Sequence, residues 1–191
     1  MKFAQEYYSK LFDFMKTIEA TDKDKNVINF DDAIEKAKQL ILSRSNAGSK
    51  LAFIGNGASQ AISSHLSTDF WKNGGVRAIA FTDPALLTCI GNDYGYPQVF
   101  AKPVEMFADP GDILVAISSS GQSENILNAC QAARKKECQI ISLSGFKPDN
   151  PLKALGDINF YVSAKEYGVV EVIHHSILHC IIDNIINSTS K

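Results

Sequence analysis

The chain has 191 residues, of which 45% are hydrophobic and 21% are charged, and its formal net charge is −2. This length suits one domain with a sizeable core, and the near-neutral balance lacks the basic stripe of a nucleic-acid-binding protein. No apolar run approaches the roughly 20 residues that a membrane span needs, so we expect neither nucleic acid nor a membrane as a partner.

The cysteines are scattered, and no two of them form a C-x-x-C pair. They are Cys89, Cys130, Cys138 and Cys180. A zinc knuckle or a redox-active dithiol is therefore not expected. The N-terminal residues also lack the apolar stretch of a signal peptide. Together these features predict reduced thiols in a cytoplasmic protein.

The first 46 residues predict two helices that precede the rest of the domain. Apolar residues between 7 and 18 recur at helical spacing, the polar residues 21–24 interrupt them, and a second helix is predicted from about Phe30. Each helix leaves an apolar stripe to be covered. We therefore predict a helical lead-in over residues 1–46 that packs on the domain or, by preference, on a second subunit.

After this lead-in, short β-rich runs alternate with helical stretches. The predicted strands are 51–54, 76–81, 113–117, 139–143 and 158–162, and the predicted helices lie near 58–72, 97–107, 122–136 and 168–187. This alternation predicts βαβ units and a five-stranded parallel sheet with helices on both faces. Ligands of such sheets bind at the carboxyl ends of the strands, where the strand order reverses. The loops after the first and third strands are therefore the candidate site.

The loop after the third predicted strand is rich in serine. Residues 118–125 read Ser-Ser-Ser-Gly-Gln-Ser-Glu-Asn and lead into a predicted helix. Hydroxyls, free backbone N–H groups and the partial positive charge of a helix N-terminus together form an anion site. The loop has no lysine and no G-K-[ST] motif, so a phosphate monoester fits better than a nucleoside triphosphate. The alternative is that the serines only cap the helix.

The loop after the first predicted strand, residues 55–60 (Gly-Asn-Gly-Ala-Ser-Gln), half-resembles the dinucleotide fingerprint G-x-G-x-x-G. Gln60 occupies the position of the third glycine, and Asp83 could serve as the ribose-binding acid, so a dinucleotide-dependent oxidoreductase is a distant alternative. A single pyrophosphate does not need the second, serine-rich loop. We therefore expect Asn56 and Ser59 to contact sugar hydroxyls.

All four histidines fall on two predicted helices, close to carboxylates. The first helix carries His65 and Asp69 four residues apart, and the last carries Glu171, His175 and His179 in one polar stripe beside His174. Imidazoles and carboxylates in this pattern suit a tetrahedral zinc site, and the alternative is a solvated stripe. Glu171 and His179 lie about 12 Å apart along an ideal helix. His175, midway between them, is thus a competing ligand, and the spacing leaves the choice open.

Three motifs resemble the sugar isomerase (SIS) domain and, within it, the bacterial sedoheptulose 7-phosphate isomerases, also called phosphoheptose isomerases. They are residues 55–59, 89–95 and 118–123. The resemblance covers nearly the whole chain. It implies one SIS domain over residues 1–191, with a flavodoxin-like, doubly wound α/β core over 47–191, and a cytoplasmic homotetramer with sites at the subunit interfaces. It also implies one Zn²⁺ per subunit and conversion of sedoheptulose 7-phosphate to D-glycero-D-manno-heptose 7-phosphate, for the heptose of lipopolysaccharide or capsule.

Carried over position by position, the resemblance implies a role for each candidate site residue. Phosphate would be held by Ser118, Ser119, Ser120 and Ser123. The sugar would be lined by Asn56, Gly57, Ala58, Asn92 and Asp93, with Ser59 and Glu171 beside them. The zinc positions would be His65, Asp69, Glu171 and His179. Asp69 would be the catalytic carboxylate and His179 the acid–base histidine.

The chain departs from the family pattern at three places. The family usually has glutamate where Asp69 stands, glutamine where Glu171 stands, and an aspartate–arginine pair where residues 168–170 read Gly-Val-Val. Glu171 is thus a second carboxylate that could act as the base in place of the shorter Asp69. Two alternatives follow: an isomerase of a different phosphosugar, or a non-catalytic, phosphosugar-binding regulatory protein that acts through a protein partner.

Overall fold

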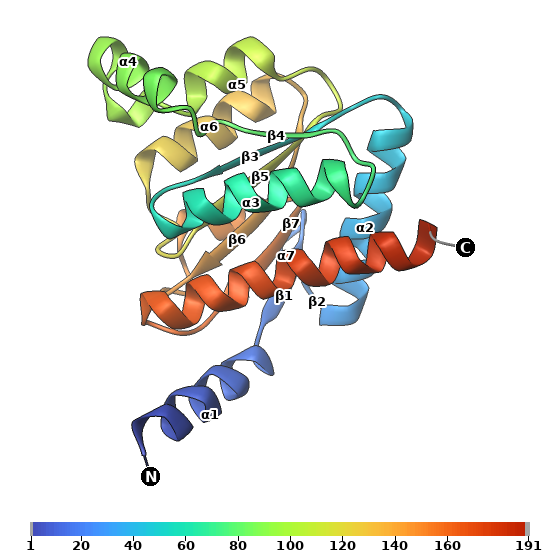
Figure 1. Ribbon diagram of the computed structural model, residues 1–191, viewed down its shortest axis with the longest axis vertical. Coiled ribbons are helices and arrows are strands. Elements are labelled where there is room, and N and C mark those ends of the chain that lie inside the picture. The colour runs from blue at the N-terminus through green and yellow to red at the C-terminus, as the bar shows by residue number, and fades with distance from the viewer. Residues whose placement is uncertain (1, 190–191) are drawn as a thin grey trace.

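Five parallel strands form the centre of the molecule (Figure 1). They are β3 (Leu51–Gly55), β4 (Ala78–Ala80), β5 (Ile113–Ser118), β6 (Gln139–Gly145) and β7 (Ile158–Val162). In this computed structural model, which describes residues 2–189, their order is β4-β3-β5-β6-β7. The prediction of a flavodoxin-like, doubly wound sheet is confirmed, and the strand order reverses between β3 and β5.

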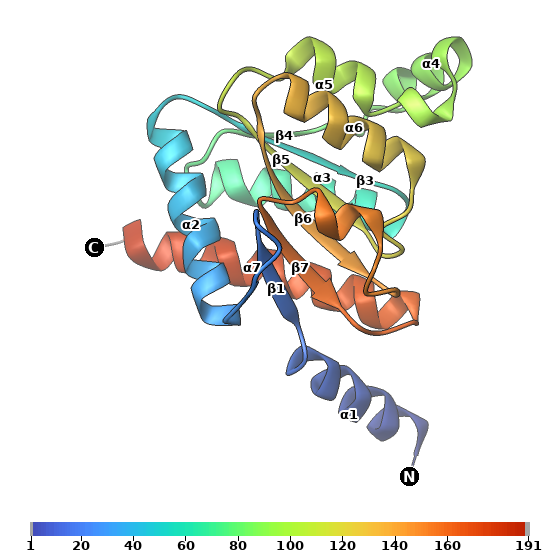
Figure 2. The same cartoon turned by 180° about the vertical axis from the view of Figure 1, so that it is seen from behind.

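Helices cover both faces of this sheet (Figures 1 and 2). One face carries α2 (Phe30–Asn46), α3 (Ala58–Lys72) and α7 (Tyr167–Thr189), and the other carries α5 (Ala101–Phe107) and α6 (Glu124–Lys135) with the short helices η1 (Tyr96–Gln98) and η2 (Pro151–Ala154). Side chains alternate along a strand, so Phe53 and Val115 point into the first core while Ile54 and Leu114 point into the second. Burial on both faces explains why these strands read as continuous apolar runs.

Residues 19–28, where the sequence predicted only a break between helices, form a β-hairpin. β1 (Glu19–Asp22) pairs antiparallel with β7 and with β2 (Val27–Ile28), which extends the sheet to seven strands. The turn is held by the Asp22 carboxylate, which accepts hydrogen bonds from the backbone N–H groups of Asp24 and Asn26, both at 2.9 Å. The two strands were not predicted because they are very short and are joined by a polar turn of four residues.

The helix α4 (Pro84–Tyr94) was also missed by the sequence prediction, and it lies at the outer edge of the molecule (Figure 1). Asp83 caps it, because its carboxylate accepts a hydrogen bond from the Leu86 N–H at 2.8 Å. Pro84 follows at the first helical position, where its missing N–H has no cost. Asp83 is therefore a helix cap, which removes the ribose-binding role considered for it.

The helix α1 (Phe3–Met15) extends away from the body of the molecule (Figure 1). Leu11 is its buried residue, whereas Phe3, Tyr8 and Phe12 are 81%, 67% and 61% exposed. Exposing three aromatic side chains on one helix to water is unfavourable in free energy.

The helix α7, predicted near 168–187, is long and apolar enough by composition to cross a membrane, although no apolar run of that length was predicted from the sequence. Half of that apolar window is buried inside the protein. Ile173, Ile177 and Ile181 are buried, and the helix packs against α2 and α3. This burial is that of a core helix and explains the apolar composition.

Candidate active site

A small polar pocket lies where the strand order reverses, between the loops that follow β3 and β5. Its volume is about 150 Å³, and it is lined by Asn56, Ser59, Ile117, Ser118, Ser119, Ser120, Ser123, Tyr167 and Glu171. The first two come from the β3–α3 segment, the next five from β5 and its loop, and the last two from the start of α7. The structure therefore brings together the two loops and the polar stripe that the sequence singled out separately.

The serine loop uses only some of its hydroxyls for its own structure. Ser118 Oγ accepts a hydrogen bond from the Gly121 N–H at 3.1 Å, and Ser120 Oγ accepts one from the Gln122 N–H at 3.2 Å. Ser123 occupies the N-cap position of α6 but makes no side-chain cap bond, and its hydroxyl has only a 3.4 Å contact with Ser118. Within residues 2–189 the Ser119 hydroxyl has no partner. Capping therefore does not explain these serines, and unused donors face the pocket beside the helix N-terminus.

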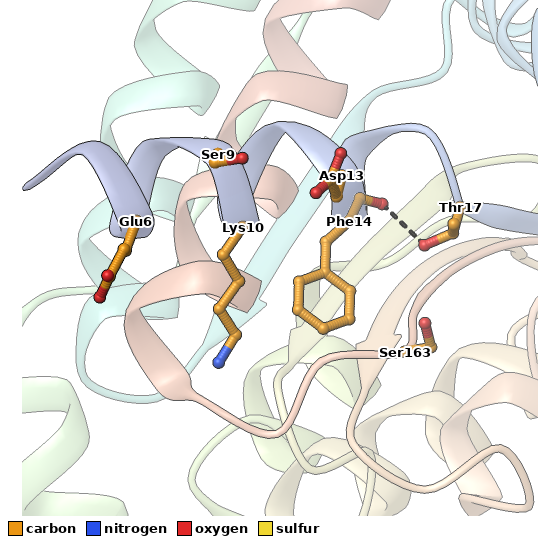
Figure 3. Close-up of a pocket in the computed structure, with 7 residues that line it drawn as sticks. All are labelled: Glu6, Ser9, Lys10, Asp13, Phe14, Thr17 and Ser163. Atoms are coloured by element: carbon orange, nitrogen blue, oxygen red, sulfur yellow. Dashed lines mark hydrogen bonds between the residues drawn. The ribbon is translucent and has the colours of Figure 1, made fainter. Parts of the chain in front are cut away.

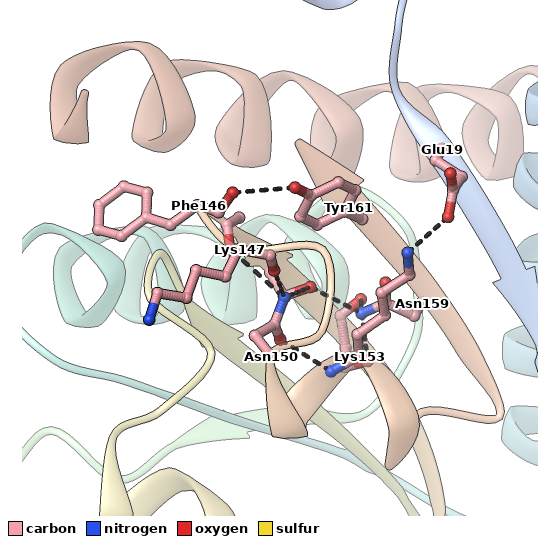
Figure 4. Close-up of polar contacts among 10 residues, drawn as sticks. Glu19, Phe146, Lys147, Asn150, Lys153, Asn159 and Tyr161 are labelled. Atoms are coloured by element: carbon pink, nitrogen blue, oxygen red, sulfur yellow. Dashed lines mark hydrogen bonds and ion pairs between the residues drawn. The ribbon is translucent and has the colours of Figure 1, made fainter. Parts of the chain in front are cut away.

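Asn150 packs against Gly121 of the serine loop and is held by hydrogen bonds of its own, which Figure 4 shows. Its amide donates to Lys147 O at 2.8 Å, and its carbonyl oxygen accepts from the Lys153 N–H at 3.0 Å. Gly121 lies directly against it in a left-handed conformation with φ of 62°, and a Cβ there would come within 2.0 Å of Asn150 Oδ1. Glycine is thus required both by conformation and by space.

The β3–α3 loop is tied to the serine loop through a pair of asparagines. Asn56 and Asn125 exchange two side-chain hydrogen bonds, at 3.0 and 2.9 Å, and the Tyr96 hydroxyl donates to Asn56 Oδ1 at 2.9 Å. Sequence reasoning missed Asn125 and Tyr96, and it also missed Tyr167 in the pocket wall. Gly57 has φ of 56° and ψ of −122°, a conformation open to glycine alone, where it precedes Ala58 at the start of α3.

Three imidazoles meet beyond the pocket, where α3 packs on α7. His65, His175 and His179 each offer one ligand atom, and these atoms all lie within 4.8 Å of one another. His175 and His179 are closest, with their Nε2 atoms 3.1 Å apart. The ring of His65 lies 5.5 Å from that of His175 and 5.6 Å from that of His179, centroid to centroid.

The two candidate carboxylates occupy different surroundings. Asp69 Oδ2 lies 3.3 Å from His65 Nε2, and its Oδ1 accepts a hydrogen bond from Asn73 at 3.2 Å. Glu171 lines the serine pocket instead, and among residues 2–189 it has no hydrogen-bond or ion-pair partner. Glu171 therefore brings a carboxylate to the same pocket that the hydroxyls of the serine loop line.

Two adjacent histidines of α7, His174 and His175, both have a lowered pKa, but their surroundings differ. His174 is fully buried with Nε2 3.0 Å from Ser144 O, and burial lowers its pKa to about 4. Burial also lowers the pKa of His175, with a further contribution from the neighbouring His179 and His65. Both rings are therefore neutral at physiological pH. His174 faces the core as a link between α7 and β6, whereas His175 has the neutral imidazole that a metal ligand needs.

Asn92 and Asp93, expected at the sugar, do not reach the pocket within one chain. They lie exposed near the end of α4, where Asn92 donates to Asp93 Oδ1 at 2.9 Å. They are not among the residues that line the pocket.

A larger hollow, about 480 Å³, lies under α1 and does not share this chemistry (Figure 3). It is lined mainly by residues of α1, together with Thr17 and with Ser163 from the segment after β7. Asp13, Lys10 and Phe14 border it without the convergent donors of the serine loop. It is open because α1 stands away from the body, and the pocket at the strand reversal therefore remains the candidate active site.

Comparison with known proteins identifies the family. Residues 6–145 match the SIS domain. The chain is 36% identical over 157 residues to a phosphoheptose isomerase of Helicobacter hepaticus, which covers 79% of this chain and 80% of that protein. It also superposes on a phosphoheptose isomerase of Neisseria gonorrhoeae, with a TM-score of 0.85, 27% identity and coverage of 96% and 97%.

A second solved structure, a phosphoheptose isomerase of Francisella tularensis, gives a TM-score of 0.84 with 30% identity, covering 97% of each chain. Each of these two matches covers nearly the whole chain. The chain therefore belongs to the SIS-domain family and, within it, to the phosphoheptose isomerases, which are sugar-phosphate isomerases.

Proposed function

We propose that the protein converts sedoheptulose 7-phosphate to D-glycero-D-manno-heptose 7-phosphate by moving a proton between two adjacent carbons through an enediol(ate). The observation that carries this proposal is one pocket that pairs unused serine donors with the unpartnered carboxylate of Glu171. The product would feed the synthesis of surface polysaccharide heptose in the cytoplasm. The four cysteines, all of them free, agree with that compartment.

The phosphate anchors the substrate at the end remote from the chemistry. Ser119 and Ser123 would donate to its oxygens, and the N-terminus of α6 would add its partial positive charge. Binding energy from this remote group positions the carbons that react. Asn56, Gly57, Ala58 and Ser59 would face the sugar hydroxyls between the two ends.

A carboxylate removes the proton next to the carbonyl group. Glu171 is the better placed of the two candidates, because it lines the pocket and no protein group occupies its oxygens, whereas Asp69 is engaged with His65 and Asn73. Glutamate in this position would return the proton to the neighbouring carbon, as general acid–base catalysis requires.

The chemistry of the site's donors fits zinc. Three imidazoles gather beside a carboxylate, and their ligand atoms lie within 4.8 Å of one another, a donor set typical of Zn²⁺. His65 and His179 would hold the ion, with Asp69 beside them. When bound, zinc would polarise the carbonyl oxygen and help to orient both reacting oxygens.

The complete site would belong to a homotetramer. α4 has no buried residue and carries Asn92 and Asp93 outward, and α1 exposes three aromatic side chains. Both observations support subunit contacts through which α4 of one chain would complete the sugar site of another. Light scattering should give four chains per particle. Mixing Asp93→Ala with Glu171→Gln subunits should restore activity that each variant lacks alone.

The direct test of function is conversion of sedoheptulose 7-phosphate, followed by chromatography of the aldose and ketose phosphates. Parallel assays with hexulose 6-phosphates test whether the enzyme selects the carbon-chain length of its substrate. Turnover of the heptulose and not of the hexuloses is the expected result. Turnover of a hexulose phosphate alone would show that the substrate is a hexulose phosphate and not the heptulose. Binding of phosphosugars without turnover would show that the protein is a phosphosugar-binding protein and not an isomerase.

A further inference from the structure

Glu171, His175 and His179 share one face of α7 but occupy different places along the site. Four residues advance an ideal helix by about 6 Å, so the three side chains follow one another along the axis. Glu171 lies at the serine pocket, whereas His175 and His179 lie with His65 of α3. The stripe that the sequence showed as one unit is therefore divided between the sugar pocket and the imidazole cluster.

The spacing of the imidazoles matches a shared tetrahedral ion. Zinc binds imidazole nitrogen at about 2.0–2.1 Å, so two nitrogens on one ion lie roughly 3.3 Å apart. The Nε2 atoms of His175 and His179 are 3.1 Å apart, and a third ligand atom, from His65, lies within 4.8 Å of both. A proton shared between His175 and His179 would explain why those two rings approach each other. It would not explain why the ring of His65 converges on them as well, whereas a bound cation would.

The surroundings of the cluster supply what a catalytic zinc site has besides its ligands. Asp69 lies 3.3 Å from the ring of His65, and carboxylates commonly orient metal-bound histidines in this way. His65 is 53% exposed at its side chain, which leaves the cluster open on one side. Three imidazoles leave the fourth tetrahedral position for substrate or water.

We propose that the metal is bound by His65, His175 and His179, with Asp69 orienting His65, and that Glu171 is not a ligand. The proposal deepens the proposed function and rests on it only in taking this metal to serve the isomerase reaction. It assigns His175 the ligand role and leaves Glu171 free as the base. His179, as a ligand, then loses the role of proton carrier.

Zinc affinity of chelator-treated protein, measured without substrate by competition with a chromophoric chelator, tests this assignment. His175→Ala should lower the affinity by more than the roughly 10–100-fold expected for loss of an orienting carboxylate in Asp69→Asn. Glu171→Gln should leave the affinity unchanged. Ser176→Ala, an exposed neighbour on α7, is the matched control, and a melting curve of each metal-free variant confirms folding.

Spectroscopy of the unaltered protein makes the test independent of any variant. X-ray absorption of the zinc-loaded protein should fit three imidazoles in the first coordination shell, and cobalt substitution should give the intense visible bands of a tetrahedral ion. Two imidazoles with two carboxylate oxygens, or unchanged affinity in His175→Ala with lost affinity in Glu171→Gln, would overturn the assignment. Because zinc binding is measured without turnover, an inactive protein that binds zinc through three imidazoles would refute the proposed function alone.

Discussion

The serine pocket and the imidazole cluster are two ends of one site built in opposite ways. The pocket is largely one continuous segment, residues 118–123, whose own backbone and hydroxyls hold its shape. The cluster joins His65 to two histidines that lie 110 or more residues further along the chain, and they meet only because α3 packs against α7. Local chemistry builds the first end, and tertiary packing builds the second.

In the proposed mechanism this difference in construction separates phosphate binding from catalysis. A substitution in the serine loop should weaken the hold on phosphate and leave the reacting groups in place. A substitution on the stripe of α7 should do the reverse, because the proposed mechanism assigns the reacting carbons to Glu171 and the histidines. Breaking each end separately therefore tests whether the two regions have the roles assigned to them.

The largest effect is expected from Glu171→Gln. The variant keeps the size of the side chain and removes the base, so kcat should fall by about 10²–10⁴-fold while KM changes little. Asp69→Asn is the matched comparison, because it should act through zinc binding and recover with excess zinc. Steady-state kinetics with and without added zinc distinguish the two, and full activity in Glu171→Gln would remove Glu171 as the base.

The next largest effect is on the fold of the serine loop. Gly121→Ala places a side chain in a left-handed conformation, which costs about 1–2 kcal/mol. It also forces Asn150 out of its hydrogen bonds, because the new Cβ would lie 2.0 Å from Asn150 Oδ1. Denaturant unfolding should show a loss of about 2–4 kcal/mol in total. A variant as stable as the unaltered protein would mean that the loop adapts and does not depend on Asn150.

Comparing single serine substitutions within the loop tests which hydroxyls bind the phosphate. Hydrogen bonds to a charged group contribute about 1.5–3 kcal/mol, so Ser123→Ala or Ser119→Ala should lower kcat/KM by about 10–100-fold. Ser120→Ala should do less, because its hydroxyl already bonds to the Gln122 N–H. Equal losses at all three positions would show that the loop's internal bonds do not decide which hydroxyls meet phosphate.

The smallest effect concerns His174, the core-facing neighbour of the stripe. Its folded pKa of about 4 lies below the ordinary value of 6.5, so the unfolded state binds the extra proton between these values. Stability is thus full above pH 6.5 and is lost as pH falls toward 4, by about 2 kcal/mol between pH 7 and pH 5. Urea unfolding at both pH values measures it. His174→Gln should flatten the dependence, and an unchanged slope would contradict the assignment.

The sequence predicted the five parallel strands because each reads as an apolar run of its own, and four of them, β3, β5, β6 and β7, are buried on both faces. The edge strand β4 is only partly buried. It did not predict β1 and β2, which are four and two residues long and adjoin a polar turn. It also missed α4, which buries no side chain and so has no apolar face to reveal its period.

For the site, the sequence predicted the serine loop as an anion site because the relevant residues are adjacent. It left His175 and Glu171 unresolved, since helical spacing places both on one face and only the packing of α3 separates them. Asn125 gave no signal, because a polar residue in the first turn of a helix is ordinary. Its partner Asn56 lies 69 residues away.

The most direct test of the account is turnover of sedoheptulose 7-phosphate by chelator-treated protein, before and after zinc is added back. We predict little aldose 7-phosphate without the metal and restored formation with it. Binding of the sugar phosphate should persist in both states, because the serine loop holds no metal ligand. Zinc-loaded protein that binds the sugar phosphate and forms no product would contradict the central claim that this site is a zinc-assisted isomerase.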